Sequence, residues 1–558
     1  MIYETIIAPF IKENATTFIV YGIVILIFFP LEGLAIPNIT GKLFDSLSSG
    51  NLGKPNSSFY ENICSKNVPG LMSLLGITWV GISLIYGLKH HVEGILIPEY
   101  LAHIRSTIYE KTMHGVDGNF KQIKTGEYLS RIFELCRNFK DMFQYLLSRF
   151  LPEVSISLII IGYLISTNLM LGSVMLFGFI ICGIIQYFGA IELIEKIGER
   201  ELHFHKNVSE KVQDSLNNLM NVYINNEIDN EIEANKKIET LSAGKLKHIS
   251  FIENVITALS QLTVVLSFSV SIYILYKMLV RKKITNSSAI VVILVMGQYM
   301  NYFFYANSGF VNNIAYKLGI IYSSKEFIDD LLNVPVRGKL VDVLSERHIE
   351  FRNISYRHDK SANKWLFDDF NMTIPGNTNV GITGRSGGGK STLMKLLIGL
   401  YTPEKGEILI DGINIKDLDP NYLRNQFVYV NQDTHLFNES VLYNMKYGTT
   451  ADDETVIKFL KEYNLDSVFS ELSDGIHGSV GINGGNLSGG MQKITMLTRG
   501  ILKSMQEGTT LILDEPLVGL DEKTVELVLY MLKCSSMLCV IITHDMRVLS
   551  LCEKVLRM

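Results

Sequence analysis

Charged residues are scarce in this chain. Asp, Glu, Lys and Arg make up 19% of its 558 residues, whereas apolar residues make up 47% and the mean hydropathy is +0.22. Soluble domains usually carry about a quarter charged residues. The deficit of charge therefore predicts membrane-spanning segments, and the length of the chain predicts more than one domain.

Cysteine and basic charge are also in short supply. The six cysteines are scattered, without a CxxC pair or a cluster of cysteine with histidine. The sequence thus predicts neither a disulfide framework nor a zinc site. The net charge at pH 7 is −5, so no basic excess favours binding of nucleic acid, and no such partner is expected.

Six apolar segments are long enough to cross the ~30 Å hydrocarbon core of a bilayer as helices. Between them lie two long, charged, helix-patterned arms, residues 89–149 and 192–253. Lys and Arg are concentrated in these arms, which places the arms and both termini in the cytosol by the positive-inside rule. The predicted spans are about 18–37, 71–88, 150–166, 169–191, 255–276 and 286–308.

The pattern changes after the sixth span. Residues 1–330 are predicted to form the membrane domain and 331–344 a linker, which includes the stretch NVPVRGKL. Residues 345–558 alternate between strand-like and helix-like segments, as in a soluble α/β domain. The predicted fold class is a six-helix membrane domain followed by an α/β P-loop NTPase domain.

The stretch GRSGGGKST has the spacing of a P-loop and stands between a predicted strand, NVGITG, and a predicted helix, STLMKLLIGL. Glycines let backbone N–H groups turn toward a phosphate, and the helix N-terminus adds partial positive charge. Lys390 is predicted to bridge the β- and γ-phosphates of ATP and Ser391 to bind Mg²⁺. The loop comprises Gly384, Arg385, Ser386, Gly387, Gly388, Gly389, Lys390, Ser391 and Thr392.

Two further apolar strands end in polar residues. TTLILDEP ends in Asp514 and Glu515, and IITH ends in His544. Behind a P-loop, Asp514 is predicted to hold Mg²⁺ through water and Glu515 to polarise the attacking water. His544 is predicted to sense the γ-phosphate. The alternative interpretation is a solvated turn for the acidic pair and a surface imidazole for His544.

The tetrapeptide LSGG at 487–490 adds the deciding pattern. Together with the P-loop, it resembles the nucleotide-binding domain of ABC transporters. With six predicted spans in front, nearly the whole chain resembles an exporter-type half-transporter of the B-subfamily kind, most strongly over 381–545. The resemblance implies an ATPase that exports or flips an amphipathic substrate: a small molecule, lipid or peptide.

The resemblance also implies a dimer in which two nucleotide-binding domains face each other head to tail. Ser488, Gly489 and Gly490 would then contact the γ-phosphate bound by the partner's P-loop. Gln432 would reach Mg²⁺ and the attacking water, and Asp521 would link the two sites. A homodimer is favoured because one chain carries both halves of a site, and a heterodimer is possible.

Several positions depart from the family pattern. The signature ends in Met491 where glutamine is usual, which predicts slower turnover without loss of the chemistry. Ile482 stands where a glutamate usually contacts the coupling helices, so coupling is expected to differ. The adenine-stacking aromatic falls at His358 by alignment, but Tyr356 lies two residues earlier and would share its strand face.

The resemblance further implies short coupling helices near 103–111 and 216–225, through which ATP-driven motion would alternate the access of the spans. A second function remains open: a non-pumping ATPase of the same architecture, acting as a gated channel or a regulatory subunit. The cargo, the membrane and the choice between homodimer and heterodimer do not follow from the sequence.

Residues that could line a cargo path are ambiguous. Gln298, Tyr302 and Tyr305 share one helix face at i, i+4 and i+7, which fits a path but fits ordinary helix packing better. Glu32 inside the first span could face a wet cavity or only a span end. Lys89–His91 favour an interfacial position over a metal site.

Overall fold

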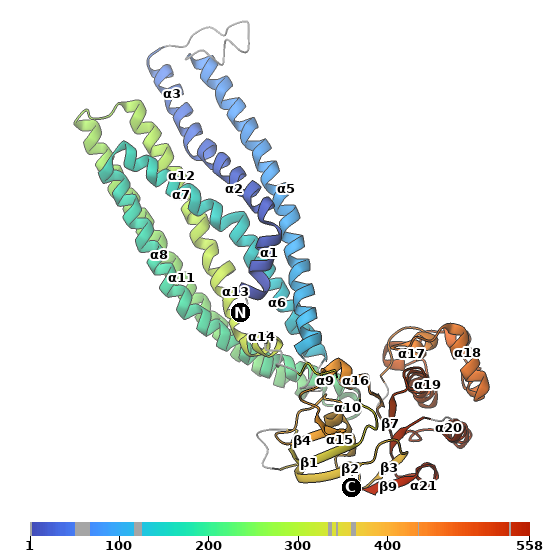
Figure 1. Ribbon diagram of the computed structural model, residues 1–558. Coiled ribbons are helices and arrows are strands. Elements are labelled where there is room, and N and C mark those ends of the chain that lie inside the picture. The colour runs from blue at the N-terminus through green and yellow to red at the C-terminus, as the bar shows by residue number, and fades with distance from the viewer. Residues whose placement is uncertain are drawn as a thin grey trace. The chain divides into compact units, whose positions relative to one another are not determined.

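The computed structural model describes residues 3–50, 67–115, 125–332, 338–341, 344–358, 364–432, 435–534 and 537–558. The chain forms two compact units (Figure 1): Met1–Gly115 with Ile123–Asn333 in the first, and Val334–Met558 in the second. Half of the predicted linker 331–344, namely residues 333–337 and 342–343, lies outside the described residues. Each unit is described below by itself.

The first unit is helical. Six helical stretches within its described residues are long and apolar enough to cross a membrane, which confirms the predicted six-span fold: Ala15–Ser48, Val68–His114, Leu129–Thr167, Leu169–Asn217, Ile228–Val280 and Asn286–Phe304. The helices are η1 (Tyr3–Ile7), α1 (Ala8–Glu13), α2 (Ala15–Pro30), η2 (Leu31–Ala35), α3 (Ile36–Ser48), α5 (Val68–Gly115), α6 (Thr125–Tyr145), η3 (Leu146–Phe150), α7 (Leu151–Thr167), α8 (Leu169–His203), η4 (Phe204–Ser209), α9 (Glu210–Asn217), α10 (Leu219–Ile224), α11 (Ile228–Val280), α12 (Asn286–Phe310), η5 (Val311–Ala315), α13 (Tyr316–Ser323) and α14 (Lys325–Leu332).

The predicted arms continue the spans without a break. At ~1.5 Å per residue, the 53 residues of α11 extend roughly 80 Å, well beyond the hydrocarbon core. The third and fourth spans are joined at Asn168, whose side chain caps α8 by accepting a hydrogen bond from Leu171 N–H at 3.1 Å. Charged arms and apolar spans are therefore parts of the same helices.

Helices α8 and α11 run side by side along their length (Figure 1), and small residues allow their close approach. A Cβ atom at Gly178 would lie 2.0 Å from the Ser267 hydroxyl, and one at Gly189 would lie 2.6 Å from Ile256. Helices packed inside a membrane commonly approach through small residues of this kind. The Gln186 amide also donates to Ser260 Oγ at 3.1 Å.

The second unit contains two sheets. An antiparallel sheet has the strand order β2-β1-β4-β5, and a parallel sheet has the order β6-β7-β8-β3-β9. The strands are β1 (Ile349–Tyr356), β2 (Phe367–Ile374), β3 (Val380–Thr383), β4 (Lys405–Ile410), β5 (Ile413–Asn414), β6 (Phe427–Val430), β7 (Thr510–Asp514), β8 (Cys539–Ile542) and β9 (Lys554–Arg557).

Apolar strands explain the parallel sheet. Every residue of β7 and β8 is buried, as expected for parallel strands that are covered on both faces. The helices of this unit are α15 (Lys390–Leu397), α16 (Pro420–Arg424), α17 (Val441–Lys446), α18 (Asp453–Glu462), α19 (Gly489–Glu507), α20 (Glu522–Cys534) and α21 (Met546–Leu549), with short 3-10 turns at Leu465–Phe469, Gly475–His477 and Ile482–Gly484.

Candidate nucleotide site

Four neighbouring strands deliver the predicted site residues to one edge of the parallel sheet. The P-loop follows β3, His544 follows β8, Glu515 follows β7 and Gln432 follows β6, and these strands are adjacent in the order β6-β7-β8-β3. The carboxyl ends of parallel strands lie at the same edge, where α/β sheets bind their ligands. Residues far apart in sequence thus converge there.

The backbone of the P-loop needs its glycines. Gly387 has a φ of +75° and Gly389 a φ of +92°, a region that costs other L-residues energy. A Cβ atom at Gly389 would also lie 2.6 Å from the ring of Phe367, which is buried. Helix α15 starts at the next residue, Lys390, so its N-terminal N–H groups open directly onto the loop.

Lys390 ties this loop to the β8 loop. Its Nζ donates to the carbonyls of Gly384 at 2.9 Å and Arg385 at 3.1 Å, and lies 3.1 Å from His544 Nε2. The lysine is only 8% exposed, whereas residues 385–388 are exposed. The Lys390 ammonium group therefore lies beneath an accessible loop whose backbone N–H groups can donate hydrogen bonds.

The two acidic residues after β7 have different environments: one is buried, and the other has a strained backbone conformation. Asp514 is 2% exposed and accepts a hydrogen bond from the Tyr429 hydroxyl at 2.9 Å. Glu515 has a φ of +46°, a conformation that costs a non-glycine residue about 1–3 kcal/mol and is often found at functional sites. The solvated-turn interpretation does not fit these two environments.

Hydrogen bonds to β8 and the residue after it hold Glu515 in this conformation. Its N–H donates to Ile542 O at 2.9 Å, and its Oε2 accepts from Thr543 Oγ1 at 3.3 Å. His544 Nε2 lies 3.9 Å from Glu515 Oε1 and 3.1 Å from Lys390 Nζ. An acid, an imidazole and an ammonium group are thus grouped at the sheet edge.

This donor set fits a Mg²⁺ nucleotide. Backbone N–H groups, an ammonium group and a helix N-terminus match a polyphosphate. The Ser391 hydroxyl, the Asp514 carboxylate and the Gln432 amide offer the hard oxygen ligands that Mg²⁺ prefers. Gln432 is exposed, and its backbone carbonyl accepts a hydrogen bond from Lys493 Nζ at 3.4 Å.

The signature segment forms the start of α19. Ser488 caps this helix by accepting a hydrogen bond from Met491 N–H at 3.3 Å. Met491 is buried, while the Gln492 amide turns back to the carbonyls of Gly484 at 2.9 Å and Leu487 at 3.3 Å. Gly489 is exposed and Gly490 is half-buried. Gln492 therefore orders the loop before the signature, a structural role that the sequence pattern alone did not predict.

Asp521 caps α20. Its carboxylate accepts hydrogen bonds from Thr524 Oγ1 at 2.6 Å and Thr524 N–H at 3.2 Å. These bonds hold the pKa of the Asp521 carboxyl below its usual range. Its predicted role in linking two nucleotide sites stays a prediction.

The two candidate adenine-stacking rings have different environments. Strand β1 ends at Tyr356, and the ring of His358 lies beside that of Tyr356, with centroids 5.2 Å apart. Tyr356 is buried and stacks on Tyr401 with ring centroids 5.6 Å apart, and burial raises the pKa of its hydroxyl to about 12. His358 is exposed, and its Nε2 lies 3.4 Å from Thr392 Oγ1. Of the two rings, His358 is the accessible one.

The predicted coupling segments also differ from each other. Residues 103–111 lie inside the long helix α5 and do not form a short helix of their own, whereas the second segment contains the separate helix α10. Met220, Tyr223 and Ile224 of α10 are exposed.

Two of the residues that could line a cargo path differ in what the structure shows. Tyr302 interacts with Glu32 by a hydrogen bond, whereas the side chain of Tyr305 lies outside the described residues.

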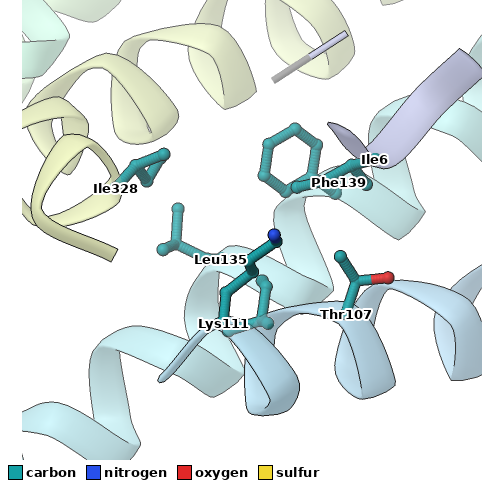
Figure 2. A pocket seen from close by; sticks show the side chains of 7 residues that line it. Ile6, Thr107, Lys111, Leu135, Phe139 and Ile328 are labelled. Atoms are coloured by element: carbon teal, nitrogen blue, oxygen red, sulfur yellow. The ribbon is translucent and has the colours of Figure 1, made fainter. Parts of the chain in front are cut away.

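A small cavity of about 20 Å³ lies between the last turns of α5 and the middle of α6, near η1 and α14 (Figure 2). A space of that size holds about one water molecule, so it is a packing gap and too small for cargo. Its lining is mostly apolar and consists of Ile6, Thr107, Ile108, Lys111, Leu135, Phe139 and Ile328.

Comparison with known proteins gives the family. The ABC transporter transmembrane region matches residues 19–303, and the ABC transporter domain matches residues 367–518. The chain belongs to the ABC transporter family. It is an integral, multi-pass membrane protein with a nucleotide-binding domain, and its fold class is as predicted.

Curated relatives of this ABC transporter match mainly through part of the chain. It is 34% identical over 220 residues to the ATP-dependent lipid A-core flippase of Neisseria gonorrhoeae, covering 39% of this chain and 35% of that protein. It is 33% identical over 237 residues to the alpha-hemolysin translocation ATP-binding protein HlyB of Escherichia coli, covering 41% of this chain and 33% of that protein. The matches span about a third of either relative.

A solved structure resembles this ABC transporter over nearly its whole length. The structure of a bacterial Atm1-family ABC exporter with ATP bound superimposes with a TM-score of 0.77. The match covers 98% of this chain and 93% of that chain at 19% identity. At this identity the likeness shows the exporter fold and not the cargo.

Proposed function

We propose that this ABC transporter is an ATP-driven exporter or flippase that works as a dimer. The observation that supports this most is the convergence of Lys390, Asp514, Glu515 and His544 at one sheet edge, in a chain that also carries six candidate spans. The same edge offers a cradle for phosphates, oxygen ligands that would suit Mg²⁺ and a carboxylate that would position the attacking water, as ATP hydrolysis needs.

Each residue has a role in ATP binding or hydrolysis that its surroundings support. The P-loop amides and Lys390 bind and orient the β- and γ-phosphates. Ser391, Asp514 and Gln432 would hold Mg²⁺, which neutralises phosphate charge when bound. Glu515 positions the attacking water, and His544, held near both Lys390 and Glu515, contacts the γ-phosphate. His358 stacks on the adenine.

Completion of the site requires a second copy. Ser488 and Gly490 lie at the N-terminus of α19, where N–H groups favour an anion. They contact the γ-phosphate held by the partner's P-loop, and Asp521 links the two sites. A homodimer satisfies this arrangement. ATP binding brings the two domains together and hydrolysis separates them, with the arms transmitting the motion to the spans.

The proposal also includes the orientation of the chain and its cargo. The Lys- and Arg-rich arms and both termini lie in the cytosol, together with the nucleotide-binding domain. The cargo is an amphipathic small molecule, lipid or peptide. This part of the proposal is supported by the charge distribution and by the flippase and translocation names of the relatives.

The test uses the full chain reconstituted in phospholipid vesicles that contain a fluorescent phospholipid as probe. ATP should drive accumulation of the probe in one leaflet, and Glu515→Gln should abolish both this movement and phosphate release. Glu454→Gln, which removes the same charge from the exposed surface of α18, should change neither. ATP-dependent ion current without uphill movement of any tested amphiphile would instead favour the channel interpretation.

A further inference from the structure

A charged cluster with three buried members lies in the first unit, outside the nucleotide site. It consists of Glu32, Lys89, Glu93, Arg149 and Glu153, contributed by η2, α5, η3 and α7. Lys89 and Glu93 are each 5% exposed, and Glu153 is 8% exposed. Ionised side chains are rarely buried to this extent unless they are paired, so each charge of the cluster needs a partner.

Pro152 leaves a backbone carbonyl without its helical donor, and the Lys89 side chain binds that carbonyl. Proline has no N–H, so the carbonyl of Ser148, four residues earlier, cannot receive its usual helical hydrogen bond. In the π-helical segment η3, the same proline also removes the N–H that a π-helical bond to Leu147 would use. Lys89 Nζ donates to Ser148 O at 3.0 Å, and the Tyr21 hydroxyl donates to Leu147 O at 2.6 Å.

Glu93 is the carboxylate with the most partners. Its Oε1 lies 2.9 Å from Lys89 Nζ and 2.8 Å from the Tyr21 hydroxyl. Its Oε2 lies 3.0 Å from Nδ1 of His90, whose side chain is 53% exposed. Glu93 and Lys89, both buried, therefore form an ion pair.

Glu153 is different. Its Oε1 lies 3.8 Å from Arg149 Nη1, on a side chain that is 59% exposed. Its Oε2 is buried and has no hydrogen-bond partner among the described residues. Burying an unpaired ionised oxygen is costly, and the solvent-exposed Arg149 beside the other oxygen offsets little of that cost.

The charge count points the same way. When ionised, the three glutamates carry three negative charges, whereas Lys89 and Arg149 carry two positive ones, which leaves one negative charge in excess as long as the exposed His90 beside Glu93 is neutral. Glu32 has a hydrogen bond with Tyr302 and lies within electrostatic reach of Lys89. The ionisable groups that face Glu153 from the surrounding elements are Lys89 of α5, Tyr145 of α6, Arg149 of η3 and Tyr302 of α12.

We propose that Glu153 is a proton-binding site, at which one proton from the solvent occupies the buried Oε2. Binding converts the carboxylate to a neutral carboxylic acid and removes the excess negative charge from the cluster. A proton is the ligand that fits, because it needs no cavity beside the buried oxygen. The site belongs to the membrane unit and makes no use of the nucleotide residues, so it stands or falls independently of the proposed function.

Infrared spectroscopy of the full chain in lipid, without nucleotide, tests this directly. At neutral pH the wild-type protein should show the carbonyl stretch of a protonated carboxylic acid, and transfer to D2O should shift it, which shows that the proton exchanges. Glu153→Gln should lose the intensity of one such carboxyl per chain. Glu192→Gln, a matched change at a 57% exposed glutamate of α8, should lose none.

Two variants, Glu153→Gln and Glu153→Asp, can each show whether Glu153 is protonated. If Glu153→Gln loses an ionised-carboxylate band instead of the acid band, the proposal is overturned. If Glu153→Gln does not fold, Glu153→Asp keeps a carboxyl at the site and should shift the acid band without removing it. An acid band that is unchanged in Glu153→Asp would also overturn the proposal.

Discussion

Replacing Gly389 by alanine tests the geometry of the P-loop most sharply. The substitution places an L-residue at a φ of +92°, which costs about 1–2 kcal/mol. It also places a Cβ atom 2.6 Å from the Phe367 ring, and this overpacking adds about 1–3 kcal/mol because the ring is buried and cannot move away. The expected loss in free energy of unfolding is therefore about 2–5 kcal/mol.

Gly508→Ala is the matched control. Gly508 has a φ of +63°, and nothing lies within 4 Å of the Cβ atom it would gain. It should lose only about 1–2 kcal/mol. Thermal unfolding of the full chain measures the difference. The midpoint temperature of the transition that ATP stabilises should fall by roughly 2–4 °C for each kcal/mol lost in a unit of this size. ATP affinity should fall only in Gly389→Ala.

A double-mutant cycle with Phe367→Leu separates strain from overpacking. Once the ring is removed, Gly389→Ala should cost much less, because only the backbone strain and the contact with Leu366 Cδ2 at 3.3 Å remain. If Gly389→Ala costs the same with and without the ring, the predicted contact with Phe367 does not exist and the reasoning is refuted.

Three further outcomes are expected. Lys390→Ala removes the ammonium group from the cradle and should weaken ATP binding about 10- to 100-fold, the equivalent of a charge-assisted hydrogen bond; equilibrium binding to the full chain measures it, and an unchanged affinity would contradict it. Tyr429→Phe removes the donor to Asp514 and should lower the free energy of unfolding by about 1–3 kcal/mol, seen as a lower thermal midpoint; no change would show that this hydrogen bond contributes nothing. Burial raises the pKa of the Cys539 thiol to about 12, so at pH 8 it stays protonated and unreactive. Alkylation followed by mass spectrometry should modify the exposed Cys534 and spare Cys539 until the protein is denatured, and equal modification of both would be the opposite result.

Much of the site could be predicted because the chemistry is encoded locally. A glycine-rich loop between a strand and a helix fixes the position of Lys390, and polar residues directly after apolar strands fix Asp514, Glu515 and His544. The membrane spans could be predicted equally well, because length and hydropathy alone determine whether a helix can cross a bilayer. The fold class followed from these two patterns.

What the sequence could not give depends on contacts between distant segments. Tyr429 and Asp514 are 85 residues apart, and no local pattern joins them. Tyr356 packs against Tyr401, which follows α15, and no local pattern joins these two rings. The role of Tyr356 or His358 in stacking on adenine stays a prediction.

The charged cluster in the membrane unit shows the same limit. Lys89 looked interfacial in the sequence because it follows an apolar run. In the structure it is 5% exposed and bonded to Ser148 O, 59 residues away. The cause is local, since Pro152 leaves that carbonyl without its helical partner, but the side chain that uses the carbonyl comes from another helix.

Complementation between two inactive variants tests the central claim most directly, namely that the nucleotide is held between two copies of the chain. Lys390→Ala destroys the P-loop half of a site and Ser488→Ala the signature half, so each homodimer lacks an intact site. A mixed dimer, however, retains one intact site of its two. Random mixing should therefore restore ATP hydrolysis to about a quarter of the wild-type rate. A mixture that stays as inactive as the separate variants would contradict the account.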